Sequence, residues 1–293
     1  LLERGANPND GEAVYHSPET YQNDAMKLLV ETGQLTSDNL VMLLIRKHDW
    51  HDYEGAKYLL ANGADPNGSR SRGWLPLHHA LARDNALRMF ELLLDHGADP
   101  TSVSGGRSAI GLAAREGRGD VLELIERRGF PVELHGADRL IAACARGDAS
   151  AARAIAEREP HLVREVLALG GELLAKFAGT GNVNGVRRLL DLGVDLRAPF
   201  AEGDGYFGEP KGSLAIHIAA WRARPAIVRL LVERGSLIDV PDANGRTPLA
   251  LAVRACVDSY WSERCSSASV QALLNAGASA RGIPFPSGHS EID

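Results

Sequence analysis

The chain has 293 residues, of which 44% are hydrophobic and 24% charged, an ordinary globular composition that argues against disorder over the whole length. Its 32 Lys and Arg stand against 38 Asp and Glu, and the net charge of −6 argues against a general nucleic-acid binder. The longest apolar run, Leu40 to Ile45, is far shorter than the ~20 residues of a membrane-spanning helix, so no membrane partner is expected.

Composition also suggests where the protein works. The three cysteines, Cys144, Cys256 and Cys265, are too few and too scattered for a disulfide scaffold, so we expect a cytoplasmic protein. Only five of the 32 basic residues are Lys, and such an Arg-heavy, Ala-rich composition indicates a bacterial source with a GC-rich genome. The chain shows no secretory signal and no initiator Met, so we expect further residues upstream of it.

One sequence motif recurs along the chain: two apolar residues, two or three polar ones, then a glycine. It stands at 1–9, 28–35, 59–67, 93–100, 124–132, 189–196, 230–239 and 273–280. The spacing fits a unit of about 33 residues, with Pro160 taking the glycine's place in one degenerate unit and with insertions lengthening the last two units. We expect the apolar pair to end a helix and the glycine to adopt the left-handed conformation that follows it.

A second phrase precedes the first at a steady offset, at 73–81, 106–114, 212–220 and 245–253. It reads GWLPLHHAL at 73–81 and GRTPLALAV at 245–253, which resembles the T-P-L-H-x-A signature of the ankyrin repeat. The resemblance implies an all-α fold, an ankyrin-repeat solenoid of stacked antiparallel helix pairs with short β-turn fingers. It also implies that His78 and His217 bridge turns by hydrogen bonds.

The resemblance implies one ankyrin repeat domain over 1–280 and a C-terminal tail at 281–293. The domain would comprise a partial unit at 1–9 and eight units at about 10–37, 38–67, 68–101, 102–133, 134–164, 165–197, 198–239 and 240–280. The units at 10–37 and 134–197 lack the T-P-L-H phrase and depart most from the pattern. A single helix pair cannot bury its own apolar face, so we expect the core between neighbouring units.

The sequence offers no catalytic constellation. No G-x-x-x-x-G-K-[ST], G-x-S-x-G or H-E-x-x-H motif occurs, and we expect no catalytic residue, no metal and no cofactor. His48 and His51 flank Trp50 beside two acids, a pattern that fits a solvated turn or a surface metal site. Cys256 and Cys265 have no further ligands at a recognisable spacing, so zinc is not expected.

Two insertions distinguish the C-terminal units. The first, 198–211, lengthens a finger, and the second, 258–266, lies between the two helices of the last unit. Their aromatic residues are Tyr206, Phe207, Tyr260 and Trp261. Aromatic residues beside Arg are common anchors of protein interfaces, so we predict that these four and Trp221 form one contiguous patch. The alternative is that they fold over their own loops as small satellite cores.

Arginine recurs at the positions that the resemblance places on the concave face, just after the paired small residues of each first helix. These arginines are Arg83, Arg115, Arg146, Arg222 and Arg254, with Trp221 beside them and Trp74 after a turn glycine. They fit a groove for an acidic segment, or ordinary surface arginines whose stems cover apolar atoms. The acidic finger, with Glu202, Asp204 and Glu209, would repel such a segment at one end, or fold back and pair with Arg222.

The function that these features favour is a non-catalytic scaffold, a monomer that binds a protein partner. The concave groove and the C-terminal insertions would make the contact. Two alternatives stay open: a small-ligand or enzymatic site within 198–266, and a structural spacer within a longer protein.

Overall fold

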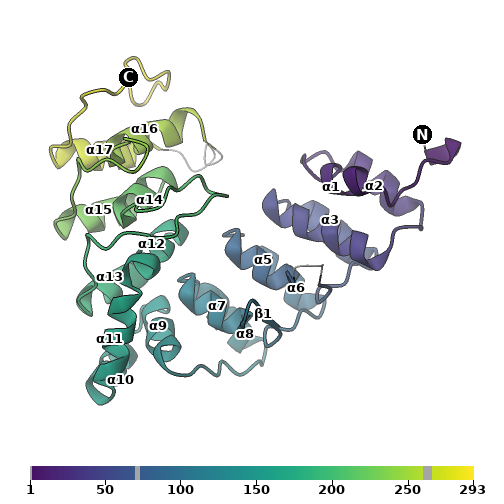
Figure 1. Ribbon diagram of the computed structural model, residues 1–293, viewed down its shortest axis with the longest axis horizontal. Coiled ribbons are helices and arrows are strands. Elements are labelled where there is room, and N and C mark those ends of the chain that lie inside the picture. Colours follow the sequence, from purple (N-terminus) through teal and green to yellow (C-terminus); the bar gives the residue numbers. More distant parts are fainter. Residues whose placement is uncertain (1, 70–72, 260–265) are drawn as a thin grey trace. The chain divides into compact units, whose positions relative to one another are not determined.

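The computed structural model describes residues 2–69, 73–259 and 266–293, and the predicted patch residues Tyr260 and Trp261 lie outside this part. Nearly all regular structure in it is helical (Figure 1). The chain divides into two compact units. Unit 1 comprises Leu1–Ala113 and Asp120–Glu133, and unit 2 comprises Ala114–Gly119 and Leu134–Asp293. No helix of the described residues is long and apolar enough to cross a membrane.

Unit 1 is a series of short helix pairs. Its elements in chain order are η1 (Leu2–Arg4), α1 (Gly11–His16), α2 (Asp24–Glu31), α3 (Ser37–Asp49), α4 (Tyr53–Ala61), α5 (Pro76–Ala82), α6 (Leu87–Asp95), β1 (Val103–Ser104), β2 (Arg107–Ser108), α7 (Ala109–Arg115) and α8 (Gly119–Arg127). Helix α3 packs against α4 and α5, and α5 packs against α6. Strands β1 and β2 pair antiparallel and form a short finger.

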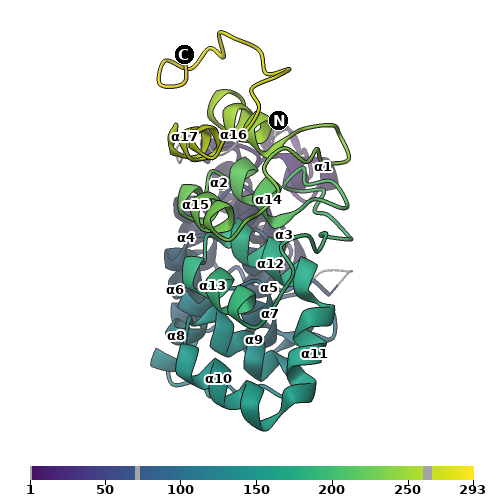
Figure 2. The ribbon, with the colours of Figure 1, turned by 90° about the vertical axis from the view of Figure 1, so that its left-hand side faces the viewer.

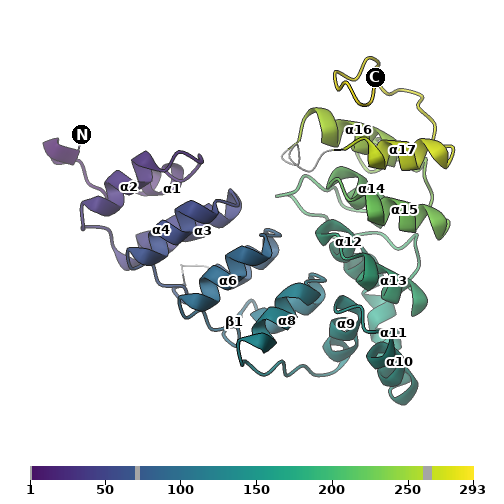
Figure 3. The ribbon, with the colours of Figure 1, turned by 180° about the vertical axis from the view of Figure 1, so that it is seen from behind.

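Unit 2 stacks its helices in two rows (Figures 2 and 3). Its helices are α9 (Ala137–Ala145), α10 (Ala149–Arg158), α11 (Pro160–Ala168), α12 (Gly170–Thr180), α13 (Val183–Asp191), α14 (Ala215–Trp221), α15 (Pro225–Glu233), α16 (Pro248–Val257) and α17 (Ala268–Asn275). Helices α12, α14 and α16 pack in succession as the first-helix row, and α13, α15 and α17 form the second-helix row. The fully buried Phe177, Ile216 and Leu231 lie within these rows.

The turn glycines and the prolines expected at helix starts have the predicted backbone positions in the structure. The recurring glycines all have a positive φ, between 64° and 99°, at Gly5, Gly33, Gly63, Gly97, Gly129, Gly193, Gly235 and Gly277. Pro76 and Pro248 occupy the first turns of α5 and α16, as expected. The helices that carry these glycines and prolines therefore begin or end where the sequence predicts.

Histidine side chains join neighbouring repeats, which confirms the role that the resemblance implied. His78 Nε2 lies 3.0 Å from the carbonyl oxygen of Arg107 within unit 1. In unit 2, His217 Nε2 lies 2.7 Å from the carbonyl oxygen of Val240, and its Nδ1 accepts the Leu214 N–H at 3.0 Å. Since Nδ1 of His217 is an acceptor, Nε2 carries the proton and donates to Val240.

An asparagine bridge, which the sequence analysis missed, ties consecutive fingers together. Asn67 Nδ2 donates to the Gly97 carbonyl, and its Oδ1 accepts the Asp99 N–H, both at 2.8 Å. Asn9 does the same two repeats earlier, toward Gln34 and Thr36. The signal was the Asn at the end of the GADPN and GANPN phrases.

The expectation that Pro160 stands in the place of a turn glycine was wrong. Helix α10 ends before Glu159, which has φ −131°, and Pro160 is the first residue of the additional helix α11. Proline suits the first helical turn because no N–H is needed there. Helix α11 buries Leu162 and Val166 and packs against α9 and α10, so this part of unit 2 contains three helices where a pair was expected.

Candidate functional site

The long finger of residues 198–213 lies between α13 and α14 in unit 2. Backbone bridges join Phe200 to Ser213 and Asp204 to Glu209. The Asp204 carboxylate accepts the N–H groups of Tyr206 at 2.9 Å and Phe207 at 3.3 Å. The finger is therefore a closed hairpin with its own hydrogen bonds.

A glycine allows the hairpin to close. Gly203 has φ +66°, and a Cβ at this position would lie 2.6 Å from the Glu209 carbonyl oxygen. A side chain would meet backbone there and would also be strained by the left-handed conformation. Gly203 therefore sets the path of the chain that carries Phe207 and Glu209.

The finger is anchored to the helices at two apolar points. Phe200 is buried with Ala175 of α12 and Ile218 of α14. Phe207 is buried with Ala223, which follows α14. These contacts hold the finger against the first-helix row of unit 2.

A buried ion pair joins the finger to the end of α14. Arg222 donates to both carboxylate oxygens of Glu209, from Nε at 2.5 Å and from an Nη at 3.1 Å. The exposed fraction of the side chain is 7% for Arg222 and 1% for Glu209. Burial raises the pKa of Glu209, and the Arg222 charge opposes that rise. This pairing is the fold-back of the finger onto Arg222 that stood as an alternative in the sequence.

Trp221 was expected at an exposed position, and the structure places it under the finger instead. It is 8% exposed, and its Nε1 donates to the Phe207 carbonyl oxygen at 2.6 Å. The Arg254 guanidinium lies 5.6 Å from the centre of the Trp221 ring. The added length of the finger explains the difference, because its extra residues cover the indole.

The aromatic patch is formed in part. Tyr206 and Phe207 stack edge to face with ring centres 4.7 Å apart, and Phe207 touches Trp221 through the hydrogen bond above. Tyr206 is 37% exposed. The other two members, Tyr260 and Trp261, lie outside the described residues, so the full patch stays a prediction.

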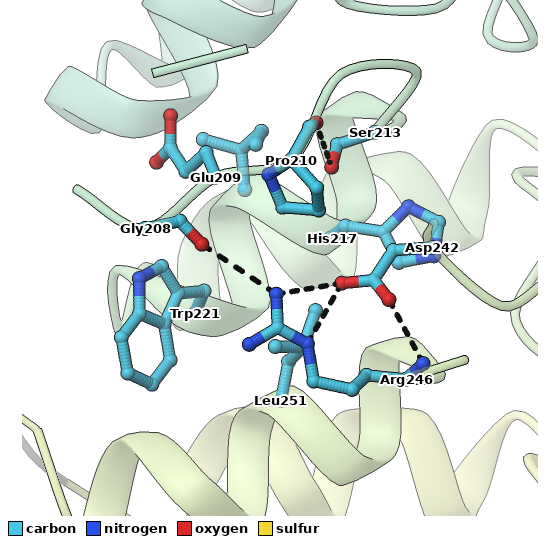
Figure 4. Close-up of a pocket in the computed structure, with 10 residues that line it drawn as sticks. Gly208, Glu209, Pro210, Ser213, His217, Trp221, Asp242, Arg246 and Leu251 are labelled. Atoms are coloured by element: carbon cyan, nitrogen blue, oxygen red, sulfur yellow. Dashed lines mark hydrogen bonds and ion pairs between the residues drawn. The ribbon is translucent and has the colours of Figure 1, made fainter. Parts of the chain in front are cut away.

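A cavity of about 10 Å³ lies beneath the finger (Figure 4). Glu209, His217, Trp221 and Asp242 line it, and Arg246 spans from the Asp242 carboxylate, 2.9 Å from its Nε, to the Gly208 carbonyl at 3.5 Å. A space of this size holds about one water molecule. Arg246 thus links two successive fingers, and the cavity is too small for an organic substrate.

In unit 1, Trp74 stands beside a charged cluster between α3 and α5. The Asp49 carboxylate lies 2.8 Å from His79 Nε2 and accepts from Arg83 Nε and an Arg46 Nη, both at 2.7 Å. Burial acts to raise the pKa of Asp49, but the hydrogen bonds and charges of His79 and Arg83 outweigh it and hold that pKa below its usual value. Trp74 is 40% exposed, and the Arg83 guanidinium lies 5.8 Å from its ring centre.

Unit 2 contains the other predicted arginines. Arg115 pairs with Asp138 at 2.7 Å, Arg146 is half-buried after α9, and Arg254 is exposed on α16. Arg83, by contrast, belongs to unit 1. Three of the predicted arginines, Arg83, Arg115 and Arg222, are thus paired with carboxylates of the chain itself.

The segment around His48 is neither a solvated turn nor a metal site. His48 and Lys47 are fully buried near the end of α3, and Lys47 Nζ lies 2.9 Å from the Asp52 carboxylate. Lys47 also donates to the carbonyls of Pro18 and Thr20. Among the described residues, no group of three His, Cys, Asp or Glu side chains is placed to hold a metal ion.

Comparison with known families identifies the repeats. Residues 41–134 match a family described as ankyrin repeats (3 copies), and residues 208–252 match one described as ankyrin repeats (many copies). The first match falls mainly in unit 1 and the second in unit 2. Residues 41–134 and 208–252 are therefore ankyrin repeats, and repeats of this class are in general non-catalytic modules for protein–protein interaction.

Individual proteins match this chain only at low sequence identity. A serine/threonine-protein kinase 12 of Arabidopsis thaliana is 30% identical over 84 residues, which are 29% of this chain and 16% of the kinase. The chain thus spans about a sixth of the curated relative that it matches. The human ASB11 ankyrin repeat domain is 21% identical, with a TM-score of 0.34 and coverage of 80% of this chain and 96% of that domain. The Bcl-3 ankyrin repeat domain is 19% identical, with a TM-score of 0.35 and coverage of 79% and 97%.

Proposed function

We propose that the chain is a non-catalytic module that binds another protein through the first-helix row of unit 2 and the finger of residues 198–213. The observation that carries this proposal is a cluster: exposed Arg254 stands over Trp221, which donates to the Phe207 carbonyl, and half-exposed Tyr206 stacks on the Phe207 ring. Arginine and large aromatic residues supply most of the binding energy in protein interfaces. Trp74 and Arg83 form a second such pair in unit 1.

The partner that fits this surface is a protein with an acidic segment. Arg83, Arg115 and Arg222 each hold a carboxylate of the chain, which supports the choice of carboxylate as the recognised group. Arg254 is exposed on α16 and Arg146 is half-buried after α9, and we propose that these two arginines contact the external acid. The formal net charge of −6 supports a partner that is not a nucleic acid.

An enzymatic or small-ligand function is the weaker candidate. The cavity beneath the finger has room for about one water. Its buried carboxylates, Glu209 and Asp242, are already bound by Arg222 and Arg246. We therefore propose a monomeric, cytoplasmic binding protein, which light scattering and cell fractionation can check.

The test of this function is capture of a partner by the purified chain from an extract of its source cells, followed by reconstitution with the purified partner. The variant Arg146→Glu/Arg254→Glu should weaken binding at least tenfold and reduce its salt dependence. Arg229→Glu is the matched control, since Arg229 is exposed on α15 of the second-helix row. Equal affinity of the double variant and the control would refute the arginine surface.

A further inference from the structure

We propose that the finger of residues 198–213 is an internal pseudo-ligand of the α14 surface, and that the partner segment displacing it carries a carboxylate two residues after an aromatic ring. The inference rests on the proposed function, because it names the chemistry of the partner. The finger itself provides the pattern, as Phe207 and Glu209.

Three contacts show what this surface recognises. The Glu209 carboxylate receives two hydrogen bonds from Arg222. The Phe207 ring centre lies 3.4 Å from the Arg222 guanidinium carbon. The Phe207 carbonyl accepts the Trp221 indole N–H at 2.6 Å. A forked cation, its stacking face and one side-chain N–H donor for a peptide carbonyl together define a site for an acidic-aromatic peptide.

The finger is built more like a tethered ligand than like a core element. It has four glycines within ten residues, at 203, 205, 208 and 212, and a Cβ added at any of the last three would meet nothing within 4 Å. Gly208 and Gly212 have φ +67° and +81°, a backbone conformation that favours glycine, whereas Gly205 is required neither by close packing nor by a positive φ. All three add conformational entropy to a released finger. Glu202 and Lys211, with side chains 83% and 74% exposed, pair at 3.5 Å across the finger in solvent.

The ion pair supplies selectivity for the displacing segment. A buried carboxylate–guanidinium pair gains little net stability, because both groups lose water. Removing Glu209 without replacing it leaves the buried Arg222 charge without that carboxylate, which lowers the stability of the closed site. A partner with the same pattern restores the contact, whereas a neutral segment does not, so the site discriminates by charge.

The experiment uses the full chain, a short-finger variant and a labelled peptide. In the variant, residues 203–210 are replaced by Gly-Gly, which keeps Phe200 and Ser213 in place. The probe is a fluorescein-labelled peptide of residues 199–213, followed by fluorescence anisotropy. The short-finger variant should bind the peptide, and the full chain should bind it at least tenfold more weakly, because a tethered finger competes at a millimolar effective concentration.

Peptide variants test the chemistry. Peptides with Glu209→Gln or Phe207→Ala should lose at least tenfold in affinity, and the Glu202→Gln peptide, altered at an exposed acid, should bind like the parent. Absence of saturable binding by a short-finger variant with unchanged helix content would overturn the proposal. Equal affinities of the Glu209→Gln and Glu202→Gln peptides would also overturn it.

A second variant covers the case in which the short-finger chain does not fold. Glu209→Gln in the full chain should speed hydrogen exchange across 201–211 and increase binding of the parent peptide; if neither changes, the proposal fails. Failure here is separable from failure of the proposed function, because the peptide titration needs no partner. A captured partner that binds the full chain and the short-finger variant equally would overturn the pseudo-ligand and leave binding through the first-helix row intact.

Discussion

Acid should destabilise unit 1 through His48, whose ring is fully buried near the end of α3. Burial and the nearby His79, with ring centres 6.3 Å apart, together lower its pKa to about 3, against the opposing effect of Asp49. Neither ring nitrogen of His48 has a hydrogen-bond partner among the described residues. The native state therefore keeps this imidazole neutral at pH values where the unfolded chain protonates it.

The sign and size follow from linkage. A histidine with a lowered native pKa contributes its full stability above the unfolded value near 6.5 and loses it as pH falls toward 3. Between pH 7.5 and pH 5 the loss is about 2 kcal/mol, since each unit below the unfolded pKa costs about 1.4 kcal/mol. At pH 3 the loss approaches about 4 kcal/mol.

Urea unfolding at pH 7.5 and pH 5.0 measures this loss, with the fluorescence of Trp50 and Trp74 as the signal for unit 1. In His48→Leu the acid-induced decrease in unfolding free energy should be smaller than in the parent by about 2 kcal/mol. His96→Leu, which removes an exposed histidine of the same unit, should behave like the parent. Equal pH dependence of His48→Leu and the parent would refute the reasoning.

Three substitutions test other local arguments. Lys47→Met should lower the free energy of unfolding by about 3 kcal/mol in urea melts, because Asp52 keeps a buried charge without its cation; an effect below 1 kcal/mol would contradict it. Gly203→Ala should open the finger at a cost of about 1–3 kcal/mol, seen as faster hydrogen exchange at 201–211, while Gly205→Ala, with free space around its Cβ, should change exchange little. Thr247→Ala should cost about 1 kcal/mol in the same melts, because its hydroxyl caps α16 at the Ala250 N–H; unchanged stability would show that the cap is dispensable.

The repeat architecture could be predicted because its signals are local. A glycine after two apolar residues and a proline at a first helical turn act through their own backbone conformations, and the structure places Gly235 and Pro248 accordingly. The histidine bridge was also predictable, since His217 reaches the next finger from a fixed helical position. Each of these features is decided within a few residues of the phrase that signals it.

The burial of charged and polar residues could not be predicted in the same way. Lys47 and His48 lie in a run of polar residues that also fits a solvated turn. Their burial depends on the loop of residues 17–23, whose carbonyls of Pro18 and Thr20 receive the Lys47 ammonium. That loop is far away in sequence and carries no motif, so only the folded unit shows why a lysine is accommodated there.

The partner of Arg222 at the candidate site could not be predicted from the sequence either. The sequence offered both an external acid and the chain's own finger as partners for Arg222, and composition alone does not separate them. In the structure Glu209 holds Arg222 from only 13 residues away, and a tether this short gives the internal carboxylate a high effective concentration. An external partner must therefore either contact Arg254 and leave the finger closed, or replace the finger with the same chemistry. Partner affinity should be insensitive to the finger in the first case and should rise when the finger is shortened in the second.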